Sequence, residues 1–182
     1  MNLLRLALVL LLAAISGVSH AEKAEGARGT AFGVDHAFSM KAPSGWIVDT
    51  ESAAAAGVGL VFYPVGKSWK NSDVVLYVRG RPKDIDVQTI DQQVDYTLND
   101  FRSHGSPQYR VESSTERAVT NGRTAKVVSY AGDRWGNLEV VGYVDERKTI
   151  NFLVMNARSK AAFEASLPVF YEILDSYQFI RD

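Results

Sequence analysis

The chain has 182 residues, a formal net charge of −1 at pH 7 and 46% hydrophobic residues. This charge balance argues against a nucleic-acid-binding surface and against a polybasic patch for anionic lipid, because both need an excess of Lys and Arg. The sequence contains no cysteine, which excludes disulfides, thiolate catalysis and a lipid-attachment cysteine. A chain of this size and apolar content is expected to form one compact domain.

The N-terminal segment has the composition of an export signal. Arg5 precedes an apolar run over 6–18, and the small residues Ser19 and Ala21 occupy the two positions that a signal peptidase recognises. The apolar run is shorter than the roughly 18 residues that a membrane-spanning helix needs. We therefore expect 1–21 to be a signal peptide cleaved after Ala21, which predicts a periplasmic or secreted protein without stable membrane insertion.

The rest of the chain is expected to contain a flexible leader, residues 22–29, followed by a single domain over 30–182. The leader is predicted from its small, polar, glycine-containing composition. Extended segments are predicted from alternating or continuous apolar runs at 38–41, 46–48, 58–65, 74–80, 109–119, 125–131, 138–144, 150–157 and 177–180. The segment 53–56 is too short to predict more than a loop or one helical turn.

The region from Thr124 to Ala157 organises the fold, because its three apolar runs are joined by short polar connections typical of an antiparallel meander. Asn121-Gly122 before it is a strong hairpin signal, and 109–119 is mostly polar, as expected of an edge strand. The strand over 74–80 is apolar on both faces, which indicates a central position. Both faces of such a sheet need a covering layer.

Two amphipathic helices are predicted to supply this cover. The first carries apolar residues at helical spacing over 87–101, and either Asp86 or Thr89 can cap its start. The second is expected to begin after Ser159, with apolar residues at helical spacing through 163–174. Pro168 lies inside it and removes a hydrogen bond, so a kink or two short helices are expected there.

Three sets of residues together resemble a known superfamily. They are Phe38-x-Met40-x-x-Pro43-x-Gly45-Trp46, Asn121-Gly122-x-x-Ala125 and Pro168-x-Phe170-x-x-Ile173-Leu174-x-Ser176-Tyr177-x-Phe179. This pattern resembles the PsbP-like superfamily, which includes the PsbP subunit of the photosynthetic oxygen-evolving complex, a Ran-binding nuclear import factor and bacterial exported proteins. The resemblance implies an α+β fold: an α/β/α sandwich with a central antiparallel sheet of about six to seven strands flanked by helices. It brings no catalytic residues with it.

No catalytic set is predicted from the residues themselves. After signal removal the imidazoles are His36 and His104, and His104 beside Ser103 is explained by a favourable position at a helix C-terminus. No G-x-S-x-G elbow is present. We therefore expect a non-enzymatic protein.

No cofactor or metal is predicted either. Asp84, Asp86, Asp91 and Asp95 lack the spacing of a calcium loop and are better explained by helix capping and a solvated face. The segment Gly57-x-Gly59 lacks the third glycine of a phosphate-binding loop, so a bulge or turn is expected.

Two tryptophans in predicted loops are the candidates for partner binding. Trp69 lies between two predicted strands, and Trp135 lies beside Arg134 in the connection 133–137, with Arg79 as a further candidate. Trp and Arg are the residue types enriched at interface hot spots, although each indole could instead fold back onto the sheet.

The leading hypothesis is a periplasmic domain that binds a protein partner, as an accessory or assembly factor of an envelope complex. The alternative is a small-molecule-binding protein or hydrolase that uses a cavity between helix and sheet, with Ser103 and His104 or the tyrosines taking part. Neither hypothesis includes nucleic acid, and the oligomeric state does not follow from the sequence.

Overall fold

The computed structural model describes residues 23–34 and 36–181. The predicted signal peptide, residues 1–21, lies outside these ranges. Within the described part of the chain, none of the helices combines the length and apolar composition that crossing a membrane requires.

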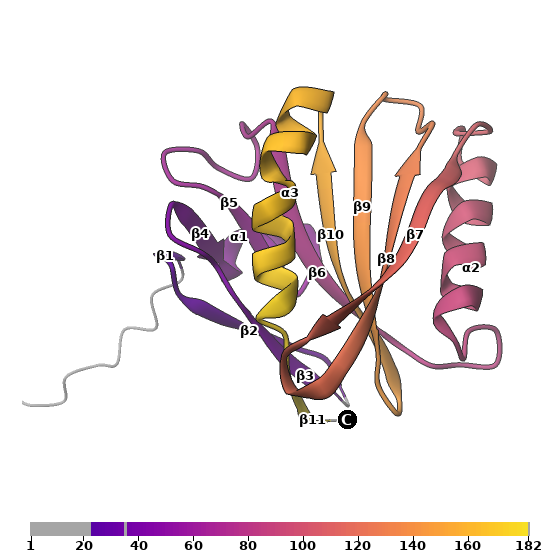
Figure 1. The fold of residues 1–182 in the computed structure, drawn as a ribbon, viewed down its shortest axis with the longest axis horizontal. Coiled ribbons are helices and arrows are strands. Elements are labelled where there is room, and N and C mark those ends of the chain that lie inside the picture. Colours follow the sequence, from indigo (N-terminus) through magenta and orange to yellow (C-terminus); the bar gives the residue numbers. More distant parts are fainter. Residues whose placement is uncertain (1–22, 35, 182) are drawn as a thin grey trace, which may run out of the picture.

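The described residues form a large antiparallel sheet of eight strands and a small antiparallel sheet of three (Figure 1). In spatial order the large sheet contains β1 (Lys23–Glu25), β4 (Trp46–Asp49), β5 (Leu60–Pro64), β6 (Val74–Pro82), β10 (Thr149–Ala157), β9 (Leu138–Asp145), β8 (Arg123–Ala131) and β7 (Arg110–Val119). The small sheet has the order β11 (Gln178–Arg181), β3 (Ala37–Lys41) and β2 (Arg28–Phe32). The large sheet is open, with β1 and β7 at its edges.

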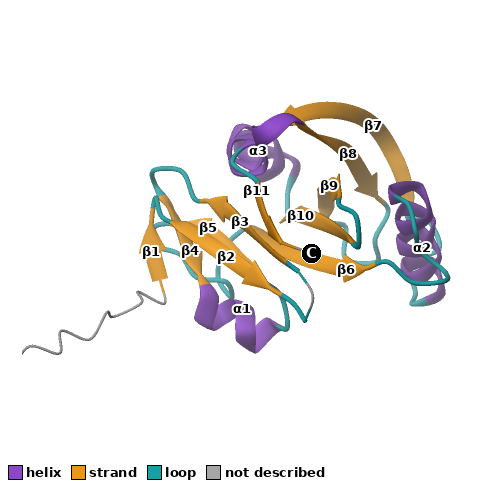
Figure 2. Ribbon diagram, turned by 90° about the horizontal axis from the view of Figure 1, so that it is seen from below, coloured by secondary structure: helices purple, strands orange, loops and turns teal. Residues whose placement is uncertain are grey.

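The helices of the described residues are α1 (Thr50–Ala56), α2 (Ile90–Ser103) and α3 (Lys160–Asp175), with a 3-10 turn at Thr120–Gly122. The face of the large sheet that carries Leu76 and Leu153 packs against α3 and the small sheet. The opposite face, which carries Tyr77 and Val154, packs against α1 and α2. Figure 2 shows α3 and α1 on opposite sides of the strands, with α2 at the far end of the sheet from β1. The protein therefore has helices on both faces of an antiparallel sheet.

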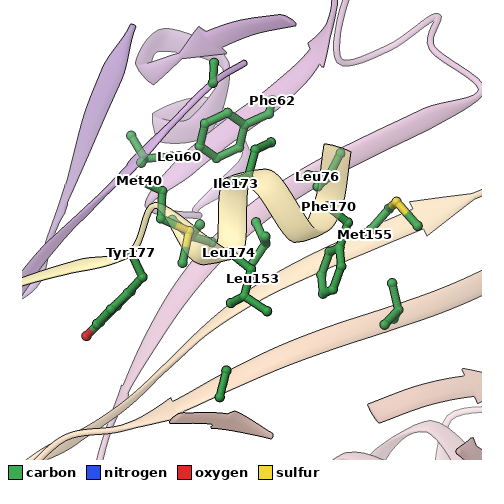
Figure 3. Close-up of a cluster of buried hydrophobic side chains, with 14 of the residues drawn as sticks. Met40, Leu60, Phe62, Leu76, Leu153, Met155, Phe170, Ile173, Leu174 and Tyr177 are labelled. Atoms are coloured by element: carbon green, nitrogen blue, oxygen red, sulfur yellow. The ribbon is translucent and has the colours of Figure 1, made fainter. Parts of the chain in front are cut away.

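The main core lies under α3 (Figure 3). Phe170, Ile173 and Leu174 of this helix are fully buried, and burying each such side chain contributes about 1.5–3 kcal/mol. The helix packs closely on β9 because residue 142 is glycine: a Cβ there would lie 2.6 Å from Cδ2 of Leu174. The apolar residues that the sequence places at helical spacing thus meet the apolar face of the central strands.

Most predicted elements are confirmed. The meander forms β8, β9 and β10, β6 is central, and β7 is an edge strand that enters the turn at 120–122. Helix α2 begins after Thr89, where the Thr89 side chain and Gln92 form the capping box. Of the two predicted caps, Thr89 is therefore the one used.

The predicted strand number, six to seven, is wrong, because the large sheet has eight strands and 37–41 belongs to a second sheet. The prediction of an unstructured leader over 22–29 is also wrong for residues 23–29. Lys23–Glu25 pairs with β4, and Arg28–Phe32 pairs with β3. Backbone hydrogen bonds to a partner strand do not require apolar side chains, so the pairing of this segment cannot be predicted from its composition.

Two helix predictions also need correction. The segment at 53–56 belongs to a seven-residue helix, α1, because the Asp49 carboxylate accepts a hydrogen bond from the Ser52 backbone N–H and Gly57 ends the helix in the left-handed region at φ 67°. The possibility of two short helices around Pro168 is wrong, because α3 is one helix. Pro168 and Glu164 are exposed, so the Glu164 carbonyl that loses its intrahelical donor lies on the side of α3 that faces water.

Candidate functional site

The connection between β8 and β9, residues 132–137, presents Trp135 to solvent. This side chain is 64% exposed, yet the connection beneath it is well ordered by hydrogen bonds. Oδ1 of Asp133 accepts from the backbone N–H groups of Trp135 at 3.1 Å and Asn137 at 2.8 Å, and Oδ2 accepts from the Asn137 side chain at 3.0 Å. We call residues 132–137 the Trp135 loop.

Arg134 ties this loop to the end of α2. Its backbone N–H donates to Ser106 Oγ at 3.0 Å, and its Nη1 donates to the carbonyl of His104 at 3.1 Å. The guanidinium carbon also lies 4.2 Å from the centre of the Trp135 ring. An aromatic ring and a cation are therefore held together on a surface whose backbone is already fixed, so little conformational entropy remains to be lost on binding.

Trp69 has a different environment from Trp135. It is partly buried and packs with Val61 and Tyr63 between α1 and the sheet. Its ring meets the edge of Tyr77 with a centroid separation of 6.0 Å. The indole is therefore part of a small core.

The four candidates do not form one patch. Arg134 and Trp135 lie together, whereas Arg79 is exposed on β6 with its guanidinium 5.8 Å from the centre of the Tyr77 ring. Trp69 also touches Tyr77, so Tyr77 connects the other two candidates. The strands between β6 and β8 separate this pair from the Trp135 loop.

The Ser103–His104 pair lies at the exposed C-terminal end of α2. Ser103 Oγ lies 3.2 Å from His104 Nδ1, and the same nitrogen is 3.3 Å from a carboxylate oxygen of Asp100. A nucleophile and an orienting acid need opposite nitrogens of the imidazole for proton transfer. Since both groups face Nδ1, this arrangement does not have the geometry of a catalytic triad.

The acidic residues near α2 have structural partners. Asp84 accepts hydrogen bonds from the backbone of Asp86 at 2.9 Å and of Val87 at 2.8 Å, which together with Arg81 lower its pKa. Asp91 forms an ion pair with Lys126. Among the residues that the structure describes, no three His, Asp or Glu side chains are placed to hold a metal ion.

A cavity between α2 and the sheet contains a feature that the sequence reasoning missed. It has a volume of about 140 Å³ and includes Glu139, which is only 8% exposed. Five aromatic side chains also line it: Tyr77, Tyr96, Phe101, Tyr143 and Phe152. We call this cavity the Glu139 pocket.

Glu139 accepts a hydrogen bond from the Tyr109 hydroxyl at 2.7 Å. Tyr109 is stacked between Phe101, with centroids 4.2 Å apart, and Tyr130, at 5.3 Å, and the Tyr130 hydroxyl lies 2.9 Å from that of Tyr143. Burial raises the pKa of Glu139, because few water molecules remain to solvate its charge. The shift is toward the neutral acid relative to a glutamate exposed to water.

One sequence signal could have revealed this group. Glu139 is a carboxylic acid inside the run Leu138–Val144, which was predicted to be covered on both faces. A carboxylate in such a strand needs a specific partner. Its partners come from loops and strands far away in the chain, so their identity was not accessible from periodicity.

The arrangement of strands and helices is that of an α+β protein with the PsbP-like fold, and the resemblance inferred from sequence is confirmed at the level of fold. The solution structure of cyanobacterial PsbP (CyanoP) from Synechocystis sp. PCC 6803 matches over 93% of this chain and 99% of its own, with a TM-score of 0.55 and 16% identity.

Two further solved structures are similar. The Ran-binding protein Mog1p of Saccharomyces cerevisiae matches over 79% of this chain and 90% of its own, with a TM-score of 0.49 and 11% identity. The PA94 protein of Pseudomonas aeruginosa, described as a putative regulator of unknown function, matches over 83% and 96% respectively, with a TM-score of 0.49 and 10% identity. No protein-family model and no curated protein matches the sequence. The match to CyanoP, with its TM-score of 0.55 at 16% identity, shows similarity of fold.

Proposed function

We propose that this protein is an exported, non-enzymatic domain that binds a protein partner of the cell envelope through the Trp135 loop. The observation that carries the proposal is the presentation of Trp135: a 64% exposed indole on a connection whose backbone is held by Asp133. A partner that covers this ring would remove its apolar surface from water, which favours binding. Export rests on the signal-like composition of residues 1–21.

The chemistry of the loop fits a protein surface. Trp and Arg dominate interface hot spots, since each offers apolar area together with hydrogen-bond donors. Here the Arg134 guanidinium lies 4.2 Å from the centre of the Trp135 ring, and hydrogen bonds to His104 and Ser106 hold Arg134 in place. A partner would cover the indole and find the guanidinium already oriented.

The test is capture of the partner from the envelope of the source cell by cross-linking followed by co-purification. Trp135→Ala should weaken capture, because loss of a central Trp costs about 2 kcal/mol or more, roughly thirtyfold in Kd. Phe32→Ala is the matched control, since Phe32 is a 73% exposed aromatic residue on β2, away from the loop.

Retention of the partner by Trp135→Ala would refute the proposal. Equal loss with Phe32→Ala would refute it too, because a nonspecific effect of exposed aromatic area would then explain the result. Both variants must first show the far-ultraviolet circular dichroism of the wild type.

A second candidate function is small-molecule binding, and the Glu139 pocket is the observation that favours it. Three tyrosines, Tyr77, Tyr96 and Tyr143, line this pocket and support the candidate. Hydrolysis has less support than binding, because Ser103 and Asp100 face the same nitrogen of His104. The two candidate functions use different surfaces, so each can be tested without the other.

A further inference from the structure

The Glu139 pocket brings together a buried acid and a set of aromatic rings. Glu139 comes from β9, Tyr77 from β6, Phe152 from β10, and Phe101 from α2. Strand pairing explains the assembly: Phe152 lies opposite Tyr143, and Val154 lies opposite Tyr77, so these side chains share one face of the sheet. Helix α2 then closes the space above them.

Among the described residues Glu139 forms no ion pair, and Arg79, the cation that lines the same pocket, lies against the Tyr77 ring instead. The pKa of Glu139 responds to burial, to hydrogen bonds from Tyr109 and Asn156, and to the negative charge of Asp133, and no cation is among these groups. A buried carboxylate is stable only when a cation or several donors compensate it. A positively charged ligand in the pocket would therefore stabilise the ionised form of Glu139.

Two of the rings that line the pocket, Tyr77 and Tyr96, each lie against an arginine side chain. The Arg81 guanidinium carbon lies 4.1 Å from the centre of the Tyr96 ring, and that of Arg79 lies 5.8 Å from the centre of the Tyr77 ring. Tyr143 and Phe152, which also line the pocket, have ring centroids 5.5 Å apart. Aromatic faces bind ammonium groups through their quadrupole, and do so most strongly where water is excluded.

We propose that the Glu139 pocket binds a small organic ammonium ion, with the Glu139 carboxylate as counter-ion and the rings of Tyr143 and Phe152 against the cation. The size agrees: a cavity of about 150 Å³ holds a benzene-sized molecule, and this one has about 140 Å³.

Binding of an ammonium ion should also affect the protonation of Glu139. Burial raises the pKa of Glu139, whereas an ammonium ion bound beside it would lower that pKa, so a proton that the acid still holds is released to the buffer on binding. The titratable and charged groups around Glu139 are Tyr109 before β7, Tyr130 on β8, Tyr143 on β9, Tyr77 and Arg79 on β6, Asp100 on α2 and Asp133 in the Trp135 loop, and Asn156 on β10 donates a hydrogen bond to it. The heat of binding should then depend on the ionisation enthalpy of the buffer.

The experiment is calorimetric titration of the purified protein with choline and with 3,3-dimethylbutan-1-ol, its uncharged carbon isostere. Choline should bind the wild type at least about tenfold more tightly than the alcohol does. Glu139→Gln should reduce choline affinity by about tenfold or more and abolish the dependence of the heat on the buffer. The Gln side chain can still accept from Tyr109, so the variant is expected to fold.

Two further variants make the test specific. Glu112→Gln removes an exposed carboxylate on β7 and should leave choline affinity unchanged. Phe152→Leu keeps most of the apolar volume but removes a ring, and should weaken choline by a few-fold while changing the alcohol less. Equal affinity for choline and the alcohol, an undiminished affinity in Glu139→Gln, or no choline binding by either calorimetry or ligand-observed NMR would each overturn the proposal.

Discussion

Substitution of the two loop tryptophans should destabilise the protein by different amounts, because one is part of a core and the other is not. Trp69 is partly buried against Tyr77. Full burial of a Trp side chain removes about 150–250 Å² from water, which at about 25 cal/mol/Å² is worth roughly 4–6 kcal/mol. About half of that, with roughly 0.5–1.5 kcal/mol for the ring contact, predicts that Trp69→Ala lowers the free energy of unfolding by about 3 kcal/mol.

Trp135→Ala should lower the same free energy by no more than about 1 kcal/mol, because the 64% exposed ring contributes little beyond its contact with Arg134. The Asp133 and Arg134 hydrogen bonds that hold the loop do not involve the indole. The loss of about 3 kcal/mol predicted for Trp69→Ala corresponds to a Tm lower by roughly 6–12 °C at this chain length.

The assay is urea unfolding followed by circular dichroism, which does not depend on the tryptophan signal that each variant alters. The slope of free energy against urea should be the same in both variants, since neither changes the surface exposed on unfolding by much. A Trp135→Ala variant that is as unstable as Trp69→Ala would refute the assignment of the two environments.

Three further predictions concern buried groups. Burial raises the pKa of Glu139 above its ordinary value of 4.5, so the folded state holds this proton more tightly than the unfolded state does. The Tm of the wild type should therefore fall relative to that of Glu139→Gln as the pH rises above that value. A Tm difference that is constant from pH 4 to 8 would contradict this. Tyr177→Phe should lower the free energy of unfolding by about 2–3 kcal/mol, since the hydroxyl accepts from Asn151 at 3.0 Å and donates to Glu146 at 3.1 Å. The double variant with Asn151→Leu should lose less stability than the sum of the two single variants. Additive losses in urea unfolding would argue against this coupling. Gly142→Ala should lower the free energy of unfolding by about 1–3 kcal/mol, because the new methyl group would clash with the fully buried Leu174 of α3. An unchanged Tm in thermal unfolding would contradict this and show that α3 can move aside.

Local pattern was enough to predict the parts of the fold whose signals lie within a few residues. The meander β8–β10 follows from three apolar runs with short connections, and α2 follows from its spacing and its Thr89 cap. The edge position of β7 follows from its polarity. These elements are encoded locally because a strand or helix must hide an apolar stripe with a fixed period.

Other parts depend on contacts that no local pattern contains. Strand β11 near the C-terminus pairs with β3 near the N-terminus, so the small sheet exists only once the chain has folded back on itself. Strand β1 is held by backbone pairing with β4, and its own side chains are polar or small. Helix α1 was underestimated because its cap, Asp49, lies at the end of a strand.

The candidate sites divide in the same way. The sequence by itself determined which residues could mark an interface, since Trp and Arg in short polar connections are recognisable from composition alone. Only the tertiary structure decided that Trp69 packs under α1 while Trp135 stays exposed, because exposure depends on which neighbouring element reaches each loop. It also decided that Glu139 of β9 accepts a hydrogen bond from Tyr109, which stacks on Tyr130, and lines a pocket under α2. Hydrophobic periodicity specifies which face of an element is buried, whereas the partners of a buried polar group are chosen by the packing of distant segments.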